Sequence, residues 1–425
     1  MTRVKRFIGQ EVLDSRGNPT VAAICELVSG ASGYAAVPAG ASRGKAEATE
    51  LRDGELNRYA GLGCRRAAAN ISGPISASFV GARDVAQLEL DEALIRLDGT
   101  EDKGRLGANA ILAASMSFAI ASASEQGVPL FSYFSQLLGQ APKHLPRPTI
   151  NLFSGGKHAG GQVSIQDVLL VTISATTADD ALAMTSAVYR AATDIVRQKY
   201  YERPLVADEG GLAPLFSGVT AMLDDAVAAI ETAGLKPGSD MAICVDLAAS
   251  EFYDSGLYRL GAESLTAAEM ISLVVKWLDD YPILSVEDAL ASEDWDNWAE
   301  LVRRVDGRAL VLGDDLLVTN PGRIQRAVEM TAASALLLKV NQIGTLTEAL
   351  EACQLAKKAG WDVSVSARSG ETEDNWLTDL AVGWSGNQLK VGSLTRSERL
   401  SKWNRLLSIE RDTGLPLAPP PASNN

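Results

Sequence analysis

The chain has 425 residues, a net charge of −14 and 46% hydrophobic residues, which is ordinary for a globular protein of more than one domain and excludes a disordered or fibrous chain. The acidic balance argues against a general nucleic-acid binder, whose phosphate contacts need a basic surface, and against a polybasic membrane-surface protein. The longest uncharged run, Leu106–Ser124, is rich in Ala and Ser and contains Asn109, so we expect a buried helix there rather than a membrane span.

Few residues of the chain are suited to thiol or imidazole chemistry. The chain has four cysteines, which are Cys25, Cys64, Cys244 and Cys353. No two of them have the spacing of a metal site. A chain of this size needs no disulfide framework and begins without an apolar signal core, so we expect a cytoplasmic protein. Only two histidines are present, which makes a Ser–His–Asp hydrolase or a His-rich metal site a poor interpretation. A metal here would be held by carboxylate oxygens, which favours Mg²⁺.

The N-terminal part, residues 1–135, predicts a small α+β domain. Strands are expected at Thr20–Val28 and Gly33–Pro38, which are rich in β-formers and bounded by Gly, Asn and Pro. From about Asp84 to Gln126 the spacing of apolar residues becomes helical. A polar, proline-containing stretch, Gly139–Pro148, is the expected linker to the next domain.

Residues 145–412 follow a different sequence pattern. Short apolar runs each end at a charged residue, and helical stretches separate these runs. The charged residues are Asp246, Glu287, Asp314, Lys339, Arg368 and Lys390. With further strands near Thr149–Phe153 and Val168–Val171, this alternation predicts an eight-stranded α/β barrel of parallel strands. In such barrels chemistry lies at the C-terminal ends of the strands. One charge there would merely mark the exit into solvent, but six in succession favour a site. The Pro-rich tail, residues 413–425, is expected to fray.

Three of these charged residues are acids and predict a metal site. Asp246, Glu287 and Asp314 would repel one another at the barrel mouth, and a divalent cation such as Mg²⁺ removes that cost. Lys339 and Lys390 would lie on the opposite rim. A lysine beside another cation and a metal has a lowered pKa and can act as a base, or both lysines can simply pair with the acids. The residues alone leave these two interpretations open.

Several loops carry weaker signals. The segments Pro38–Glu47, Ser154–Gly161 and Ala207–Pro214 are rich in glycine and small residues, and such segments can serve as lids with glycine hinges. Arg368 and Ser369 offer a guanidinium and a hydroxyl, which together suit a phosphate.

Several segments of the sequence resemble those of the enolase (phosphopyruvate hydratase) family. They include DSRGNPTV (14–21), GASRG (40–44), HAGG (158–161), DEGG (208–211), SVEDAL (285–290), GDDLLVTN (313–320), LLLKVNQIGTLTEAL (336–350) and RSGETED (368–374). The resemblance implies a small α+β domain followed by an enolase-type (β/α)8 barrel of ββαα(βα)6 order. It also implies dehydration of 2-phosphoglycerate to phosphoenolpyruvate with two Mg²⁺ per active site, usually in a homodimer or higher homo-oligomer.

The resemblance further assigns roles residue by residue. Asp246, Glu287 and Asp314 would hold the first Mg²⁺, and Ser42, on a loop, would help to bind the second. The acid–base residues would be Lys339, which removes the α-proton, and Glu209, which helps the 3-hydroxyl to leave. The substrate-binding residues would be Lys390 at the carboxylate, Arg368 and Ser369 at the phosphate, and His158 closing over the substrate.

Five positions depart from the family's pattern. Where the family has HRSGETED, this chain has Ala367 in place of the histidine. Where the family has QEF, this chain has Asp167 in place of a glutamate in the catalytic region. In the family's SGAST loop, this chain has Ala39 in place of the first serine and Arg43 in place of the threonine. Where the family has NGG, this chain has SGG, beginning at Ser154. Asp167 could transfer a proton or only make room. Three of the changes reduce side-chain volume, and Arg43 adds a cation suited to anions, so we expect a pocket enlarged at the phosphate end.

The enlarged pocket would suit a substrate with a longer anionic head. A relative of the enolases that fits this description is carboxyphosphonoenolpyruvate synthase of phosphinothricin-type antibiotic pathways, which dehydrates 2-phosphonoformylglycerate. The sequence therefore predicts a hydro-lyase acting on a small phospho- or phosphono-glycerate. The alternatives are a glycolytic enolase, a superfamily member acting on another acid, and a catalytically inactive enolase-fold binding protein, against which the retained Lys339 and Glu209 weigh.

Overall fold

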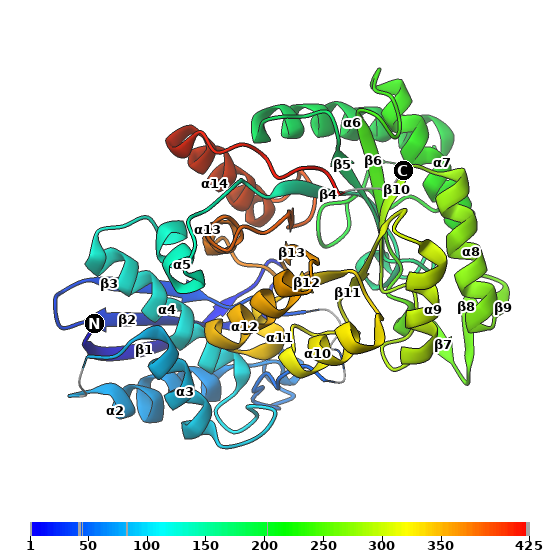
Figure 1. Ribbon diagram of the computed structural model, residues 1–425. Coiled ribbons are helices and arrows are strands. Elements are labelled where there is room, and N and C mark those ends of the chain that lie inside the picture. The colour runs from blue at the N-terminus through cyan, green and yellow to red at the C-terminus, as the bar shows by residue number, and fades with distance from the viewer. Residues whose placement is uncertain (1, 41–43, 45, 82–83, 202, 422–425) are drawn as a thin grey trace.

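The computed structural model describes residues 2–40, 44, 46–81, 84–201 and 203–421, arranged as an N-terminal α+β domain beside a closed α/β barrel (Figure 1). The N-terminal strands form an antiparallel sheet in chain order and are β1 (Val4–Leu13), β2 (Pro19–Leu27) and β3 (Ser32–Ala36). The two expected strands are confirmed as β2 and β3. The helices that follow are α1 (Arg65–Asn70), the π-turn η2 (Ile71–Ile75), α2 (Ser76–Phe79), α3 (Gln87–Asp98), α4 (Ala108–Gln126) and α5 (Leu130–Leu138).

Helix α4 is the buried helix expected from the long uncharged run. Its small residues let it lie almost flat on the sheet: a Cβ at Gly33 of β3 would meet the Ser117 carbonyl oxygen at 2.2 Å. Asn109 near its start is buried and accepts from the Leu51 amide. Among the described residues, no helix has both the length and the apolar character needed to cross a membrane.

Eight strands close the barrel. In chain order they are β4 (Arg147–Ser154), β5 (Asp167–Thr172), β6 (Met241–Asp246), β10 (Ile283–Glu287), β11 (Leu310–Gly313), β12 (Ala335–Leu338), β13 (Asp362–Ser366) and β14 (Gln388–Lys390). Every expected strand is found. The expectation of parallel strands throughout is wrong for β5, which runs antiparallel to both β4 and β6. The chain between β4 and β5 contains only one short 3-10 turn, and a parallel pair needs a longer crossover.

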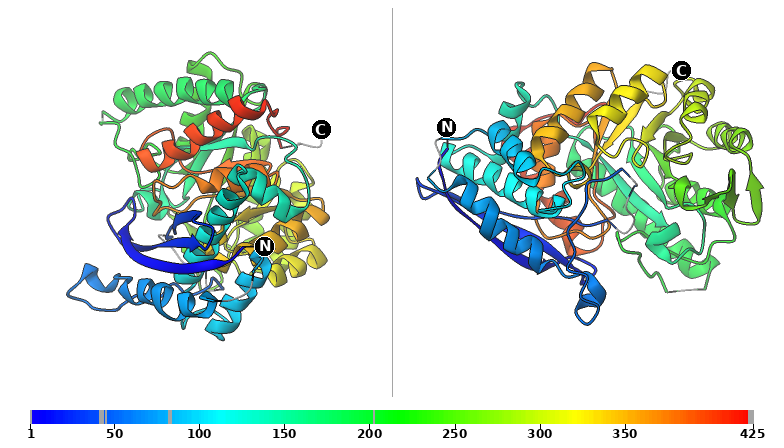
Figure 2. Two further views of the ribbon diagram at one scale, coloured as in Figure 1. Left: turned by 90° about the vertical axis from the view of Figure 1, so that its left-hand side faces the viewer. Right: turned by 90° about the horizontal axis from the view of Figure 1, so that it is seen from below.

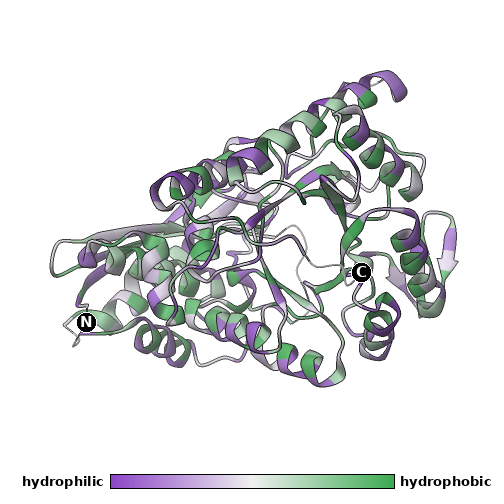
Figure 3. Ribbon diagram, turned by 45° about the horizontal axis from the view of Figure 1, so that its top comes forward, coloured by the Kyte–Doolittle hydropathy of each residue, from purple (hydrophilic) through white to green (hydrophobic). Residues whose placement is uncertain are grey.

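Helices surround the barrel and connect its strands (Figure 2). They are α6 (Ala178–Lys199), α7 (Val219–Thr232), α8 (Ala267–Asp280), α9 (Trp295–Val305), α10 (Pro321–Met330), α11 (Val340–Ile343), α12 (Leu346–Lys358), α13 (Trp376–Gly383) and α14 (Ser397–Thr413). Several begin at a side-chain cap. Thr266 accepts from the Glu269 amide, and Asn320 precedes Pro321 at the first helical position. These helices carry hydrophilic and hydrophobic residues along the same ribbon (Figure 3), as helices with one buried face do.

The smaller elements complete the chain. They are the 3-10 turns η1 (Tyr59–Gly61), η3 (Gly156–Ala159) and η4 (Ala249–Glu251), and the sheet of β7 (Tyr253–Asp254), β8 (Leu257–Leu260) and β9 (Glu263–Leu265). The N-terminal domain packs on the barrel through α3 and α4, which contact α12 and α11. This contact places the loops of the N-terminal domain near the C-terminal ends of β12 and β13.

The described part of the tail is packed rather than frayed, so that expectation is wrong. Leu417 and Ala418 are buried, and Leu145 exchanges backbone hydrogen bonds with Pro416 and Ala418. The buried guanidinium of Arg147 donates twice to the Ala418 carbonyl, at 3.0 and 2.7 Å. A buried guanidinium needs acceptors, and this carbonyl supplies them. The proline content indicated only that no helix forms there.

Candidate active site

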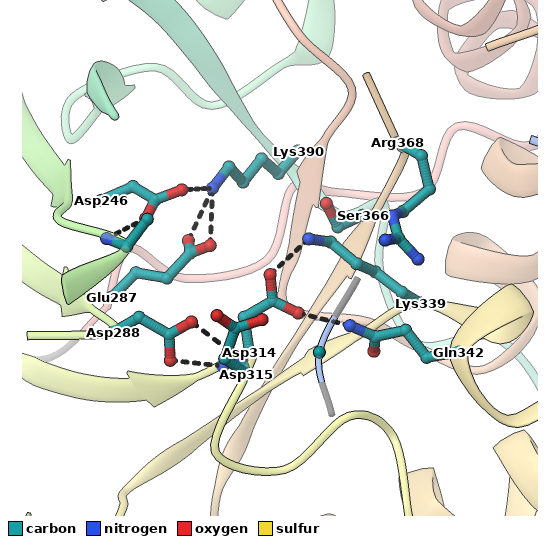
Figure 4. Close-up of polar contacts among 12 residues, drawn as sticks. Asp246, Glu287, Asp288, Asp314, Asp315, Lys339, Gln342, Ser366, Arg368 and Lys390 are labelled. Atoms are coloured by element: carbon teal, nitrogen blue, oxygen red, sulfur yellow. Dashed lines mark hydrogen bonds and ion pairs between the residues drawn. The ribbon is translucent and has the colours of Figure 1, made fainter. Parts of the chain in front are cut away.

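The C-terminal ends of the barrel strands bring the six predicted charged residues to one mouth (Figure 4). Three are the last residues of their strands, and the other three follow a strand by one or two residues: Asp246 (β6), Glu287 (β10), Lys390 (β14), Asp314 (after β11), Lys339 (after β12) and Arg368 (after β13). Four of them, Asp314, Lys339, Arg368 and Lys390, line a cavity with about 420 Å³ of empty space, part of it open to solvent. The cavity is lined by Glu47, His158, Gln166, Glu209, Asp314, Asp315, Lys339, Ser366, Ala367, Arg368, Ser369 and Lys390.

Both lysines pair with the acids. Lys390 Nζ lies 2.9 Å from Asp246 Oδ2 and 2.8 and 2.7 Å from the two carboxylate oxygens of Glu287. Lys339 Nζ donates to Asp314 Oδ2. Of the two interpretations that the residues left open, the structure shows the pairing. A base role for Lys339 is compatible with this pairing and belongs to the function proposed below.

The charges at the mouth shift one another's pKa values. Burial lowers the pKa of Lys339, but the neighbouring carboxylates, Asp314 before Glu287, raise it, and the net shift is upward. Among the protein's own groups the carboxylates outweigh burial, and the lowered lysine pKa expected beside a bound metal stays a prediction. Burial lowers the pKa of Lys390 as well, and Asp246 and Glu287 lift it well above its ordinary value.

Negative charge at the mouth exceeds what the lysines neutralise. Burial and then the Asp246 charge hold the pKa of Glu287 well above its ordinary value, although Lys390 opposes them. Burial and then Asp314 raise the pKa of Asp315 to about 7. Oxygen atoms of Asp288, Asp314 and Asp315 lie within 4.8 Å of one another and could hold a metal ion. A cation fits this donor set, because it would offset the repulsion among the carboxylates, which adds to the effect of burial on these pKa values.

Asp288 and Asp315 were not singled out in the sequence, although they directly follow Glu287 and Asp314. The two carboxylate oxygens of Asp288 accept from the backbone amides of Asp314 and Asp315, at 3.0 and 2.8 Å. Asp288 therefore fixes the turn that presents Asp314. The sequence signal was available, since each is the second acid at a strand end.

A hydrogen-bond chain orients Asp314 from the other side. Gln342 Nε2 donates to Asp314 Oδ1 at 2.7 Å, and Thr319 Oγ1 donates to Gln342 Oε1 at 2.9 Å. Thr319 Oγ1 also accepts from the Lys339 amide at 2.9 Å. Val318 and Thr319 have φ values of 41° and 53°, which costs β-branched residues of the order of 1–3 kcal/mol each. This strained turn places one hydroxyl where it serves both Asp314 and Lys339.

A second polar cluster lies across the barrel from Lys339, where His158 of η3, Asp167 of β5 and the loop residue Glu209 meet. His158 Nδ1 is 3.0 Å from Asp167 Oδ2, and its Nε2 is 3.8 Å from Glu209 Oε1. Burial lowers the pKa of His158, but Asp167 and then Glu209 raise it, to about 9. Asn151 Nδ2 donates to Glu209 Oε2 at 3.1 Å and fixes that carboxylate. The histidine is therefore a cation held between two acids.

Arg368 and Ser369 lie where the N-terminal domain meets the barrel. Arg368 donates to Glu47 and, at 3.0 Å, to Asn341 Oδ1. Burial lowers the pKa of Arg368, but the nearby acids, Glu47 and then Asp314, raise it, and the net shift is upward. Arg399 of α14 donates to the carbonyls of Arg368 and Ser369 at 2.7 Å each, which fixes the backbone of this segment. Glu47, Asn341 and Arg399 were not predicted, since only tertiary contact shows what they touch.

The loop expected to close from the N-terminal domain is described only in part. Ala39 exchanges backbone hydrogen bonds with Gly370 at 2.8 and 2.9 Å, so the loop begins beside the Arg368 segment. Ser42 and Arg43, which were predicted to bind the second metal and the substrate, lie outside the described residues.

Comparison with models of known protein families covers both halves of the chain. The model for the enolase N-terminal domain matches residues 4–134. The model for the enolase C-terminal TIM barrel domain matches residues 142–416. The two matches together span the N-terminal sheet, all eight barrel strands and every described residue of the candidate site.

Proposed function

The chain belongs to the enolase family, and on that premise we propose that it catalyses the Mg²⁺-dependent dehydration of a 2-phosphoglycerate-like acid to an enolpyruvate product. Membership supports a lyase that binds a small phosphorylated acid. The mouth described above supports the rest of the proposal: three acids at neighbouring strand ends, a lysine within reach of one of them, and cations facing an anion site. We further propose a cytoplasmic homodimer or higher homo-oligomer.

The metal would lie among the strand-end acids. Asp246, Glu287 and Asp314 would hold one Mg²⁺, and a second would involve Ser42. When bound, the cations stabilise the negative charge that develops on the substrate carboxylate as the α-proton leaves. Lys390, anchored by Asp246 and Glu287, supplies further positive charge for that carboxylate. The chain thus provides both the ligands and an adjacent ammonium.

The acid–base residues stand on two sides of the cavity. Lys339 follows β12, whereas Glu209 is held by Asn151 of β4 and by His158, which bonds to β5 on the opposite side of the closed barrel from β12. Removing a proton from one carbon and expelling hydroxide from the next requires a base and an acid around the substrate. We assign the base to Lys339 and assistance of the departing hydroxyl to Glu209.

The anionic head would bind at the Arg368 segment. Arg368 and Ser369 both line the cavity, and a guanidinium with a hydroxyl beside it suits a phosphate or phosphonate. In the structure the Arg368 guanidinium donates hydrogen bonds to the Glu47 carboxylate, so a bound anion would share or replace that contact. Arg399 keeps the backbone in place while this exchange occurs.

The observation that carries our choice of substrate is the cavity wall at Ala367. This residue is one of the lining residues and stands directly before Arg368, where the family's pattern has a histidine. A methyl group in that position leaves room next to the phosphate-binding pair. We therefore propose 2-phosphonoformylglycerate as substrate and carboxyphosphonoenolpyruvate as product, in phosphonate biosynthesis. The second candidate, a glycolytic enolase acting on 2-phosphoglycerate, is favoured by the retained acids and lysines.

Restoring the family's residues is expected to reverse the substrate preference. In the variant Ala367→His with Asp167→Glu, the imidazole fills the space beside Arg368, so kcat/KM for the phosphonoformyl substrate relative to 2-phosphoglycerate should fall by about 10–200-fold. The measurement is kcat/KM on both substrates for the wild type, each single variant and the double variant. Ala367→Ser, which adds little volume, is the matched control and should keep the wild-type ratio. An unchanged ratio in the double variant would contradict the enlarged pocket.

A further inference from the structure

Two of the departures from the family's pattern form a direct contact. Ser154 ends β4 and Asp167 begins β5, and the antiparallel register places them opposite each other. Ser154 Oγ donates to Asp167 Oδ1 at 2.6 Å, and both side chains are fully buried. Cross-strand partners have Cβ atoms about 5 Å apart, so a short hydroxyl and a short carboxylate can meet directly. The two short side chains therefore fit each other as a pair.

The remaining oxygen of Asp167 is also occupied. Its Oδ2 lies 3.0 Å from His158 Nδ1, so each carboxylate oxygen has a partner. Among the described residues, those lining the cavity include His158 and Glu209 but not Asp167. The Asp167 carboxylate therefore faces His158, and of these two residues only His158 lines the cavity for the substrate.

Ser154 is itself rigidly placed. Its amide donates to the Leu212 carbonyl at 2.9 Å, and its carbonyl accepts from Gln162 Nε2 at 3.0 Å. The first contact ties β4 to the segment that carries Glu209, and the second ties it to the end of the His158 loop. A hydroxyl on a backbone fixed at both sides can set the direction of the carboxylate that it contacts.

We propose that Asp167 is a positioning residue that acts on the reaction through His158, and that Ser154 orients Asp167 for this task. Asp167 accepts from Nδ1–H of the imidazole and turns Nε2–H toward Glu209 and the cavity. His158 then presents a fixed N–H donor to the departing hydroxyl or the anionic head. The role of His158 toward the substrate rests on the proposed function, whereas the Ser154–Asp167–His158 chain does not.

A double-mutant cycle separates this role from direct proton transfer by Asp167. We expect Asp167→Asn to lower kcat/KM about 10–100-fold in the wild-type background, which is a usual cost of removing the group that orients a functional histidine. In a His158→Gln background the same change should have almost no further effect, because its route to the substrate is gone. Losses that multiply in the double variant would overturn the proposal, since Asp167 would then act on the substrate itself.

A spectroscopic measurement tests the chain without requiring turnover. The protein has only two histidines, so ¹⁵N-histidine NMR of the full chain gives one signal set for His158 and one for the reference, His144. Burial lowers the pKa of His144, whereas the acids facing His158, which are Asp167, Glu209 and Asp246, raise its pKa to about 9. Asp167→Asn should lower the pKa of His158 by at least about one unit, because a facing anion is lost.

Ser154→Ala and Ser154→Thr complete the test. Without the hydroxyl, Asp167 loses its direction, so the pKa of His158 should fall and its Nδ1 proton should exchange faster with water. Threonine keeps the hydroxyl and should restore both values, while the His144 signals stay unchanged in every variant. A His158 pKa that is unchanged or higher in Ser154→Ala would overturn the orienting role of Ser154. If the NMR results hold and no variant or wild type turns over either substrate, the proposed function fails and the positioning chain stands.

Discussion

Replacing Lys339 by methionine is expected to lower kcat/KM by about 10²–10⁴-fold, the usual contribution of a general base. Lys339 follows β12, lines the cavity and, in the proposed reaction, takes the α-proton. Initial rates on the preferred substrate measure the loss, and exchange of the α-proton with deuterium in heavy water reports the abstraction step alone. Both should fall together if the lysine is the base.

Lys339→Arg is the matched control for that experiment. Arginine keeps the positive charge and can keep the pair with Asp314, but its guanidinium does not lose a proton in proteins. Removing one partner of a buried pair costs about 3–5 kcal/mol of stability, so the methionine variant alone could fail through unfolding. We expect Lys339→Arg to fold with a near wild-type melting temperature and to stay inactive. Activity restored by arginine would show that Lys339 serves only as the partner of Asp314.

Replacing Glu287 by glutamine is expected to weaken Mg²⁺ binding by about 100-fold or more, beyond the 10–100-fold typical of residues that only support metal ligands. Glu287 is the central acid of the three strand ends, and burial and then the Asp246 charge raise its pKa; a cation would offset the repulsion between the two carboxylates. A 100-fold loss of affinity removes up to about 2.7 kcal/mol of Mg²⁺-dependent stabilisation. Isothermal titration with MgCl₂ gives the affinity, and the melting temperature with and without Mg²⁺ gives the stabilisation.

Glu263→Gln on β9 is a matched control, since it removes the same charge from an exposed site. It should leave both the Mg²⁺ affinity and the melting temperatures unchanged. Mg²⁺ binding by Glu287→Gln as tight as that of the wild type would place the metal elsewhere and remove the assigned role of the strand-end acids.

The barrel could be predicted because its strands are buried on both faces. Buried parallel strands give continuous apolar runs, and the charged residues at their ends, such as Asp246 and Lys390, mark the side of the barrel where chemistry is expected. The direction of β5 could not be read this way, because an antiparallel strand buried on both faces has the same apolar run. The helical segment from α1 to α2 was missed as well, since Gly73 and Pro74 within it are typical turn residues.

The site was predictable in its charged residues and not in the contacts that orient them. Gln342 reaches Asp314, and Thr319 reaches Gln342, only after the chain folds back, and a lone Gln or Thr in the sequence carries no such signal. The pairing of Lys390 with Asp246 and Glu287 depends on distances between strands that are remote in sequence. Ser154 and Asp167 were noted as separate departures, and only the β4–β5 register shows that they touch.

The most direct test of the proposed reaction is a paired turnover assay followed by ³¹P NMR. The purified full-length protein is given 2-phosphonoformylglycerate or 2-phosphoglycerate with MgCl₂, and each reaction is repeated with excess EDTA. We predict the enolpyruvate product from both acids only with Mg²⁺, and formed faster from the phosphonoformyl substrate. Faster turnover of 2-phosphoglycerate would instead identify a glycolytic enolase with a wider pocket, and no Mg²⁺-dependent product from either acid would contradict the dehydratase itself.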